Sequence, residues 1–160
     1  MEYPKNDPIT PNYNRDDLGY AVVTLQKLLG LEYTLYVRLQ NFHWNVTGMF
    51  FRPLHKLFGG QYEEVGKFID QIAEQIRKYG AAAPGSMMEF GELSAGMDEF
   101  PGRLVEASAM IQIALDGHEL LASYLNSFKL TQLDLATQNL VGNILDFHMQ
   151  SSWQLRSHLE

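Results

Sequence analysis

Residues 41–80 read NFHWNVTGMFFRPLHKLFGGQYEEVGKFIDQIAEQIRKYG, and the interpretation of the whole chain starts from this stretch. Beyond His55 its apolar side chains recur at gaps of three and four residues, which predicts an amphipathic helix with one buried face. The recurring positions are Phe58, Tyr62, Val65, Ile69, Ile72 and Ile76. We expect this helix to follow a turn at residues 45–48 and to end near Tyr79, with Gly80 just past its end.

The same stretch carries four side chains with the chemistry of metal ligands. Asp70 and Glu74 are four residues apart and share one face of the helix. His55 points to about the same side but lies about 22 Å away along the axis, too far for one ion to bind both groups. His43 precedes the helix and can join His55. Two histidines and two carboxylates suit a divalent transition metal such as iron or zinc.

The residues alone allow two interpretations of the distance between His55 and the two carboxylates. The imidazoles and the carboxylates are unrelated, or two copies of the helix pack antiparallel about a two-fold axis. In the second case His55 of one copy meets Asp70 and Glu74 of the other, which is the reciprocal match that a two-fold contact gives.

The composition narrows the class of protein. A chain of 160 residues is long enough for one domain with a sizeable core. It has no cysteine, which excludes disulfides, thiolate metal sites and thiol catalysis. The net charge of −7 argues against strong nucleic-acid binding, which requires clustered Lys and Arg. We expect neither a signal peptide nor a membrane span, because no apolar run of the required kind is present.

The rest of the chain reads as helices around the central one. Residues 1–16, with three prolines, are expected to form an irregular arm, and residues 17–160 one helical domain. Asp16 or Asp17 is expected to cap a helix that runs to about His43, with Gly30 as an interior weak point.

The second half is expected to hold two more long helices. Residues 81–102 read as a crossover with a short helix at 87–93. A third long helix is expected at about 103–128 and a fourth at about 134–159, with Thr131 as a plausible cap before it. Long helices joined by short connections and one longer crossover predict an all-α four-helix bundle.

His43-Trp44-Asn45, His55 twelve residues later and Asp70-x-x-x-Glu74 resemble the Dps-like mini-ferritins, the DNA-binding proteins from starved cells. The resemblance spans about residues 18–159. It implies a ferritin-like four-helix bundle whose short extra helix lies in the crossover between the second and third long helices. It also implies a hollow shell of twelve subunits in the cytoplasm.

The resemblance further implies a ferroxidase that oxidises Fe(II), with hydrogen peroxide as the preferred oxidant, and stores the Fe(III) mineral. The metal ligands would be His43 and His55 of one subunit with Asp70 and Glu74 of its two-fold mate, and zinc could substitute for iron. Trp44 would be an electron donor. Asp134 would line a pore through which iron enters.

This sequence departs from the family at several points. Gly59 stands where members often have another acid, which puts a second iron position in doubt, although Glu63 could substitute. No Glu-x-x-His motif occurs, which disfavours a di-iron centre inside the bundle. A lysine-rich tail is also absent, so we expect DNA binding to be weak or absent.

Three alternatives to the ferroxidase remain. They are a DNA-protecting, nucleoid-binding shell with weak or no ferroxidase activity, a shell whose site holds zinc or stays vacant, and an unrelated helical interaction protein. Among the remaining candidates, we expect His118 and His148 to be core residues and His158 to be exposed. Trp44 and Trp153 are most simply packing residues.

Overall fold

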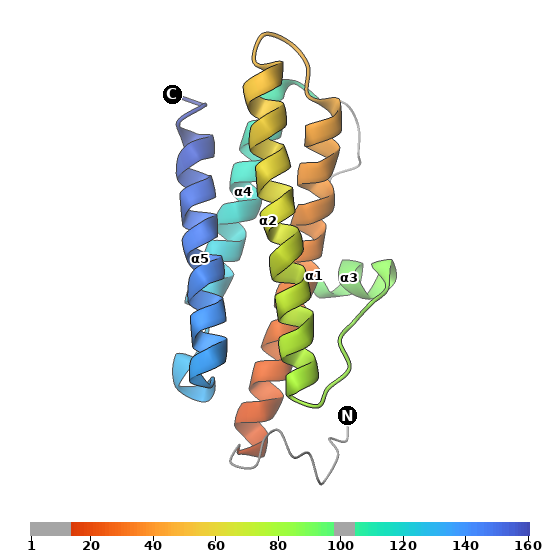
Figure 1. The fold of residues 1–160 in the computed structure, drawn as a ribbon, viewed down its shortest axis with the longest axis vertical. Helices are drawn as coiled ribbons and strands as arrows, with labels where there is room; N and C mark the ends of the chain where they lie inside the picture. The colour runs from red at the N-terminus through yellow and green to blue at the C-terminus, as the bar shows by residue number, and fades with distance from the viewer. Residues whose placement is uncertain (1–13, 98–104) are drawn as a thin grey trace.

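The computed structural model describes residues 14–97 and 105–160, which form helices and no strand (Figure 1). The long helices are α1 (Arg15–Asn45), α2 (Phe51–Lys78), α4 (Ala107–Asn126) and α5 (Leu135–Arg156). The short helix α3 (Met87–Leu93) lies in the crossover between α2 and α4, and a 3-10 turn, η1 (Leu130–Gln132), precedes α5. The expected all-α four-helix bundle with a short helix in its crossover is confirmed.

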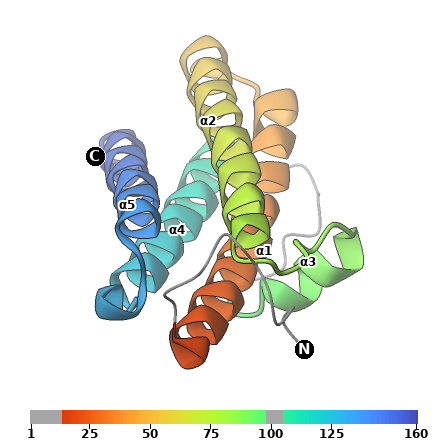
Figure 2. The same cartoon turned by 60° about the horizontal axis from the view of Figure 1, so that its bottom comes forward.

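The helices form two antiparallel pairs, α1 with α2 and α4 with α5 (Figures 1 and 2). Short connections join the members of each pair, so each pair is a helical hairpin. Figure 2 shows α3 outside the bundle and beside α1. None of the helices in the described part of the chain is both long and apolar enough to cross a membrane.

The helix ends follow local capping chemistry, and three of the predicted ends are wrong. The first helix begins two or three residues early, because its cap is Asn14 rather than Asp16 or Asp17, and the Asn14 side chain accepts from the Asp16 backbone N–H. Thr131 lies in η1 and caps nothing, since the Asp134 side chain accepts from the Thr137 N–H at 2.8 Å and caps α5. α4 begins only at Ala107, because Val105 and Glu106 are not helical.

The end of α2 is as predicted. Tyr79 is the C-cap residue of the helix, and Gly80 follows with a φ of 82°, a conformation that glycine adopts without steric cost. Residues 1–13 of the expected arm, and residues 103–104 of the expected third helix, lie outside the described residues.

The core fills the space between the two hairpins with apolar side chains. Its largest fully buried members, from α1, α2 and α4, are Phe42, Phe58, Leu25, Leu28, Leu29, Leu31, Leu35, Leu39, Leu54, Ile72, Ile76 and Met110. Every long helix presents one apolar face to this core, as the predicted periodicity of α2 required. The polar faces are left outside, where functional side chains can lie.

Candidate metal site

The connection between α1 and α2 brings His43 and His55 together at one end of the bundle. His43 lies in the last turn of α1 and His55 in the second turn of α2. Their rings stack, with centroids 3.8 Å apart and an interplanar angle of 20°. The sequence therefore identified a pair of histidines that the structure does place in contact.

Two reciprocal hydrogen bonds fix these rings. His43 Nδ1 lies 2.7 Å from the backbone oxygen of His55, and His55 Nδ1 lies 2.7 Å from the backbone oxygen of His43. A carbonyl oxygen can only accept, so each Nδ1 carries the hydrogen. In the neutral rings each Nε2 then has a lone pair, and this is the tautomer that a metal ion binds.

Aromatic rings line both ends of the histidine stack. Phe51 lies against His55, with ring centroids 5.0 Å apart. Tyr62 meets His43 edge-on at 5.3 Å. These neighbours limit how far either imidazole can turn, so the two rings are held in place before any metal binds. Sequence reasoning missed Tyr62 as a neighbour of the site, although it is seven residues after His55 and so shares its helix face.

Asp70 and Glu74 are exposed on α2, further along the helix than His55. One chain does not bring them to the histidines, because fifteen residues of helix separate His55 from Asp70, about 22 Å along the axis. Within residues 14–97 and 105–160, no three His, Cys, Asp or Glu side chains lie close enough together to hold a metal ion. A single chain thus offers two imidazole ligands in one place and two carboxylates in another.

The two tryptophans and Asp134 are the other residues that the sequence analysis singled out. Trp44 follows His43 and is 65% exposed, and Trp153 is 64% exposed, so neither indole is a packing residue in the single chain. Asp134 caps α5 and accepts hydrogen bonds from the hydroxyls of Tyr79 and Thr137. Its carboxylate is therefore already engaged within the chain.

A cluster of three ionisable side chains is buried inside the bundle. His148 Nε2 is 2.8 Å from Glu32 Oε1, and His148 Nδ1 is 2.8 Å from His118 Nδ1, with all three side chains fully buried. His118 and His148 are core residues, as expected. Burial, with His148 as a smaller cause, holds the pKa of His118 well below its ordinary 6.5. The partners of His148 lie at opposite edges of its ring, so the three groups do not converge on one point.

Glu32 is the member of this buried group that sequence reasoning missed. A signal for it exists, because Glu32 interrupts the apolar stripe of α1 at helical spacing between Leu28 and Leu35. A charged residue on a buried face calls for a buried partner from another helix. The identity of this partner, His148, could not be predicted from the sequence of α1, because His148 lies 116 residues after Glu32.

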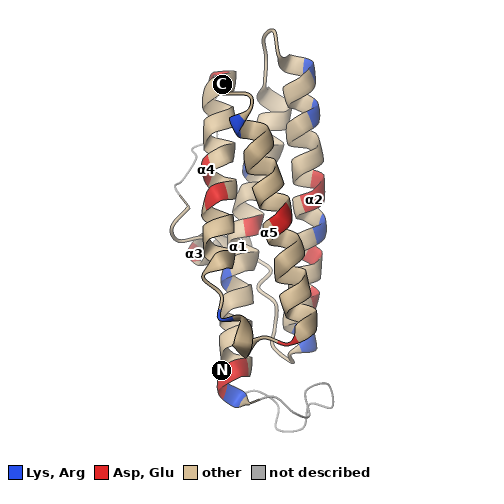
Figure 3. Cartoon of the chain, turned by 90° about the vertical axis from the view of Figure 1, so that its left-hand side faces the viewer, with Lys and Arg blue, Asp and Glu red and all other residues tan. Residues whose placement is uncertain are grey.

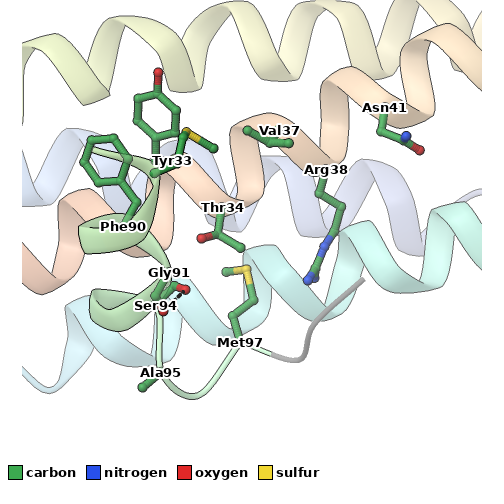
Figure 4. Close-up of a pocket in the computed structure, with 11 residues that line it drawn as sticks. Tyr33, Thr34, Val37, Arg38, Asn41, Phe90, Gly91, Ser94, Ala95 and Met97 are labelled. Carbon is green, nitrogen blue, oxygen red and sulfur yellow. Dashed lines mark hydrogen bonds between the residues drawn. The ribbon is translucent and has the colours of Figure 1, made fainter. Parts of the chain in front are cut away.

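A cavity of about 430 Å³ lies between α1 and α3 (Figure 4). Tyr33, Val37 and Arg38 of α1 and Phe90 and Met97 of the crossover are among its lining residues, and Arg38 is the charged side chain among the lining residues that the structure describes. None of the four predicted metal ligands lines it. The cavity is thus separate from the candidate metal site.

Charge is spread over the surface of α2. Figure 3 shows acidic and basic positions mixed along this helix, which includes Asp70, Glu74 and Lys67. Lys67 pairs with Glu64 at 2.6 Å. A mixed surface of this kind gives no continuous basic stripe for a phosphate backbone.

Comparison with known proteins agrees with this architecture. The family model of the ferritin-like domain matches residues 23–160. The chain is 32% identical to an uncharacterized low temperature-induced protein of a Nostoc species over 154 residues, covering 91% of this chain and 83% of that protein. It is 27% identical to DNA protection during starvation protein 2 of Deinococcus radiodurans, covering 94% of this chain and 63% of that protein.

Among solved structures, Dps92 from Deinococcus radiodurans superposes with a TM-score of 0.84 at 27% identity, covering 91% of this chain and 88% of that one. The family match covers most of the chain, and the all-α fold agrees with it. The chain belongs to the ferritin-like family and is similar to its Dps members.

Proposed function

We propose that this protein is an iron-storage and iron-detoxification ferroxidase whose metal site is shared between two-fold-related subunits. The observation that carries the proposal is the histidine pair with its two Nε2 lone pairs and, among residues 14–97 and 105–160 of the same chain, no carboxylate that completes a metal site with them. Such a half-site gains full coordination when a second copy supplies Asp70 and Glu74. The family membership supports a role in iron storage.

Each residue has a chemical task in this proposal. The Nε2 atoms of His43 and His55 bind Fe(II), and the Nδ1 hydrogen bonds keep the rings oriented toward it. The carboxylates of Asp70 and Glu74 from the mate supply negative charge, which favours Fe(III) over Fe(II). Zinc suits the same ligand set and would compete for the site.

Hydrogen peroxide is the oxidant we propose. Two Fe(II) ions each give one electron to one peroxide, which takes up two protons and leaves as two waters. Fe(III) then joins an oxide-hydroxide mineral inside a shell of twelve subunits in the cytoplasm. Trp44, exposed and next to His43, is the proposed donor of an electron when only one Fe(II) is bound, and Asp134 the proposed lining of a pore for iron.

The test is stopped-flow oxidation of Fe(II) by the assembled protein, with peroxide and with dioxygen. The double variant His43→Ala/His55→Ala should lose the fast phase, and so should Asp70→Asn/Glu74→Gln. Glu92→Gln is the control, because Glu92 is an exposed acid on α3, away from the predicted ligands. If the double histidine variant oxidises Fe(II) as fast as the wild type, the histidine pair is not the ferroxidase site.

Co-assembly separates a shared site from two unrelated ones. When the histidine variant and the acid variant are refolded together, a mixed two-fold pair regains one complete site, with histidines from one chain and acids from the other. Fast oxidation should therefore return in the mixture although each variant alone is inactive. A mixture that stays inactive, with mixed assembly verified by mass spectrometry, contradicts the shared site.

The second candidate function is DNA protection by the shell with weak or no ferroxidase activity. The similarity to a DNA protection during starvation protein favours it. The mixed charge of α2 and the net charge of −7 weigh against it. A normal shell that oxidises no iron but shifts DNA in a gel at low salt would favour this candidate.

A further inference from the structure

Gly59 is buried in α2, one turn after His55, and it lies against the Nδ1–Cε1 edge of the His43 ring. A Cβ atom built on Gly59 would be 3.0 Å from His43 Nδ1 and 3.1 Å from His43 Cε1. Ordinary van der Waals contact for a Cβ begins near 3.4 Å. The imidazole therefore occupies space that any side chain at position 59 would need.

Three contacts hold the His43 ring where it lies against Gly59. Its Nδ1 is held at 2.7 Å from the backbone oxygen of His55, and the His55 ring stacks on it with centroids 3.8 Å apart. Tyr62 contacts it edge-on from the next turn of α2. A Cβ at position 59 would push the ring at the same atom that makes the hydrogen bond, so the bond and the stack would both be disturbed.

Gly60 provides the contrast. It is the next residue of the same helix, yet a Cβ built on it meets nothing within 4 Å, and it is exposed. Helix propensity would favour alanine over glycine at both positions by about 1 kcal/mol. The difference between the two glycines is thus the imidazole above Gly59.

We propose that Gly59 is a specificity-determining residue of the metal site. Its missing side chain leaves room for the Nδ1–Cε1 edge of His43 against α2, and this seat excludes an acid from position 59, so that each site binds one metal ion tightly. The proposal rests on the proposed function, since it concerns the same histidine pair. Gly59 is a positioning residue, because it touches the imidazole and not the metal.

The chemistry of an acid at this position makes the proposal testable. Because position 59 is one turn from His55, an acid there would be expected to add a ligand for a second ion. In this chain the added carboxylate would start from a Cβ in contact with the His43 ring. We therefore expect Gly59→Asp to weaken the existing site instead of adding another.

The experiment compares Gly59→Ala, Gly59→Asp and Gly60→Ala in the assembled protein. Zn(II), and Fe(II) without oxygen, are titrated by calorimetry for affinity and for the number of tight ions per chain. Loss of a group that orients a metal ligand typically costs about 10–100-fold in metal affinity. Gly60→Ala should match the wild type, with one tight ion per chain, and Gly59→Ala and Gly59→Asp should bind at least about tenfold more weakly.

Two results would overturn the proposal. Either Gly59→Ala binds metal as tightly as Gly60→Ala, or Gly59→Asp gains a second tight ion. Size-exclusion chromatography and thermal unfolding verify that each variant still assembles, so that weak binding is not mistaken for misfolding.

A crystal structure of metal-free Gly59→Ala provides a readout that does not depend on metal. We expect the His43 ring to be shifted away from position 59, with a longer distance from its Nδ1 to the backbone oxygen of His55, and a ring that stays in place contradicts the proposal. If the wild type itself binds neither metal, the proposed function fails, while the crystal structure still decides whether Gly59 seats His43.

Discussion

At the scale of single residues, Glu32, His148 and His118 form a buried hydrogen-bonded chain. The two Nδ1 atoms are 2.8 Å apart, and a hydrogen bond between them requires one to donate and the other to accept. The Glu32 carboxylate accepts from His148 Nε2 at 2.8 Å. Three helices are joined through these groups, so the protonation of His118 is coupled to the packing of α1, α4 and α5.

The low pKa of His118 makes stability depend on pH. Because burial lowers this pKa in the folded state, the folded protein releases a proton that the unfolded chain binds below about pH 6.5. The contribution to stability is complete above that pH and falls as the pH drops, by up to about 1.4 kcal/mol per pH unit. Urea unfolding measured between pH 7.5 and 5 should show this loss.

His118→Gln is the variant that tests this assignment, since glutamine has no proton to gain in this range. Its unfolding free energy should be lower than that of the wild type at pH 7.5, but it should fall less steeply toward pH 5. Equal slopes in the two proteins would mean that another group causes the pH dependence.

Asp134 has a structural role in addition to the pore lining proposed for it. It caps α5 through the Thr137 N–H and also accepts from the Tyr79 hydroxyl. Burial and, to a lesser extent, this hydrogen bond raise the pKa of Tyr79. The carboxylate thus stabilises the end of the bundle whether or not it also attracts iron.

A pair of substitutions at Asp134 separates these two roles. Asp134→Ala removes the cap and should cost about 1 kcal/mol of stability, whereas Asp134→Asn retains a capping oxygen and should cost less. If the residue lines a pore, both variants should take up iron more slowly. Unchanged uptake in Asp134→Asn would restrict the residue to its structural role.

At the scale of elements, the contact between α1 and α3 depends on Gly30. The sequence marks Gly30 as a weak point of the first helix, but the structure shows why a glycine is there. A Cβ built on it would lie 2.4 Å from the Cβ of Leu93 and 3.1 Å from the carbonyl oxygen of Phe90. The glycine lets the end of α3 lie directly on α1.

Gly30→Ala should therefore destabilise the protein, although alanine is the better helix former. Overpacking of this kind costs about 1–3 kcal/mol. Gly19→Ala in the same helix meets nothing within 4 Å and should be neutral or stabilising by up to about 1 kcal/mol. Chemical unfolding of the two variants measures the difference, and equal stabilities would show that α3 moves away without cost.

At the scale of the whole molecule, the net charge determines the non-specific affinity of the protein for DNA. The chain carries 19 acidic and 12 basic residues, and α2 mixes both signs. Neutralisation of phosphates by clustered Lys and Arg supplies most non-specific affinity for DNA. The assembled protein is thus expected to approach DNA against a net repulsion.

We expect no retardation of linear DNA in a gel at about 0.15 M salt, where the Debye length is about 8 Å. A variant with four lysines added to the amino terminus is the positive control and should shift the DNA. Retardation of the unmodified protein that disappears as salt is raised would show a basic surface formed only in the assembly.

The sequence by itself determined the bundle, the crossover helix and the pairing of His43 with His55. Helical periodicity identifies buried faces without knowledge of the partner, and twelve residues across a tight turn leave two histidines few places other than side by side. The reach of α2 likewise determined that Asp70 and Glu74 cannot join the histidines within one chain.

Only the tertiary structure decided three features. These are the N-terminal caps Asn14 and Asp134, the close approach of other side chains to Gly30 and Gly59, and the buried partner of Glu32. Neighbouring polar residues compete for the same cap, and a local pattern does not say which one wins. Whether a glycine is an irregularity or a necessity depends on which side chain lies above it, and that side chain comes from another helix. The seat of His43 on Gly59 is such a contact, because two helices must pack before it exists.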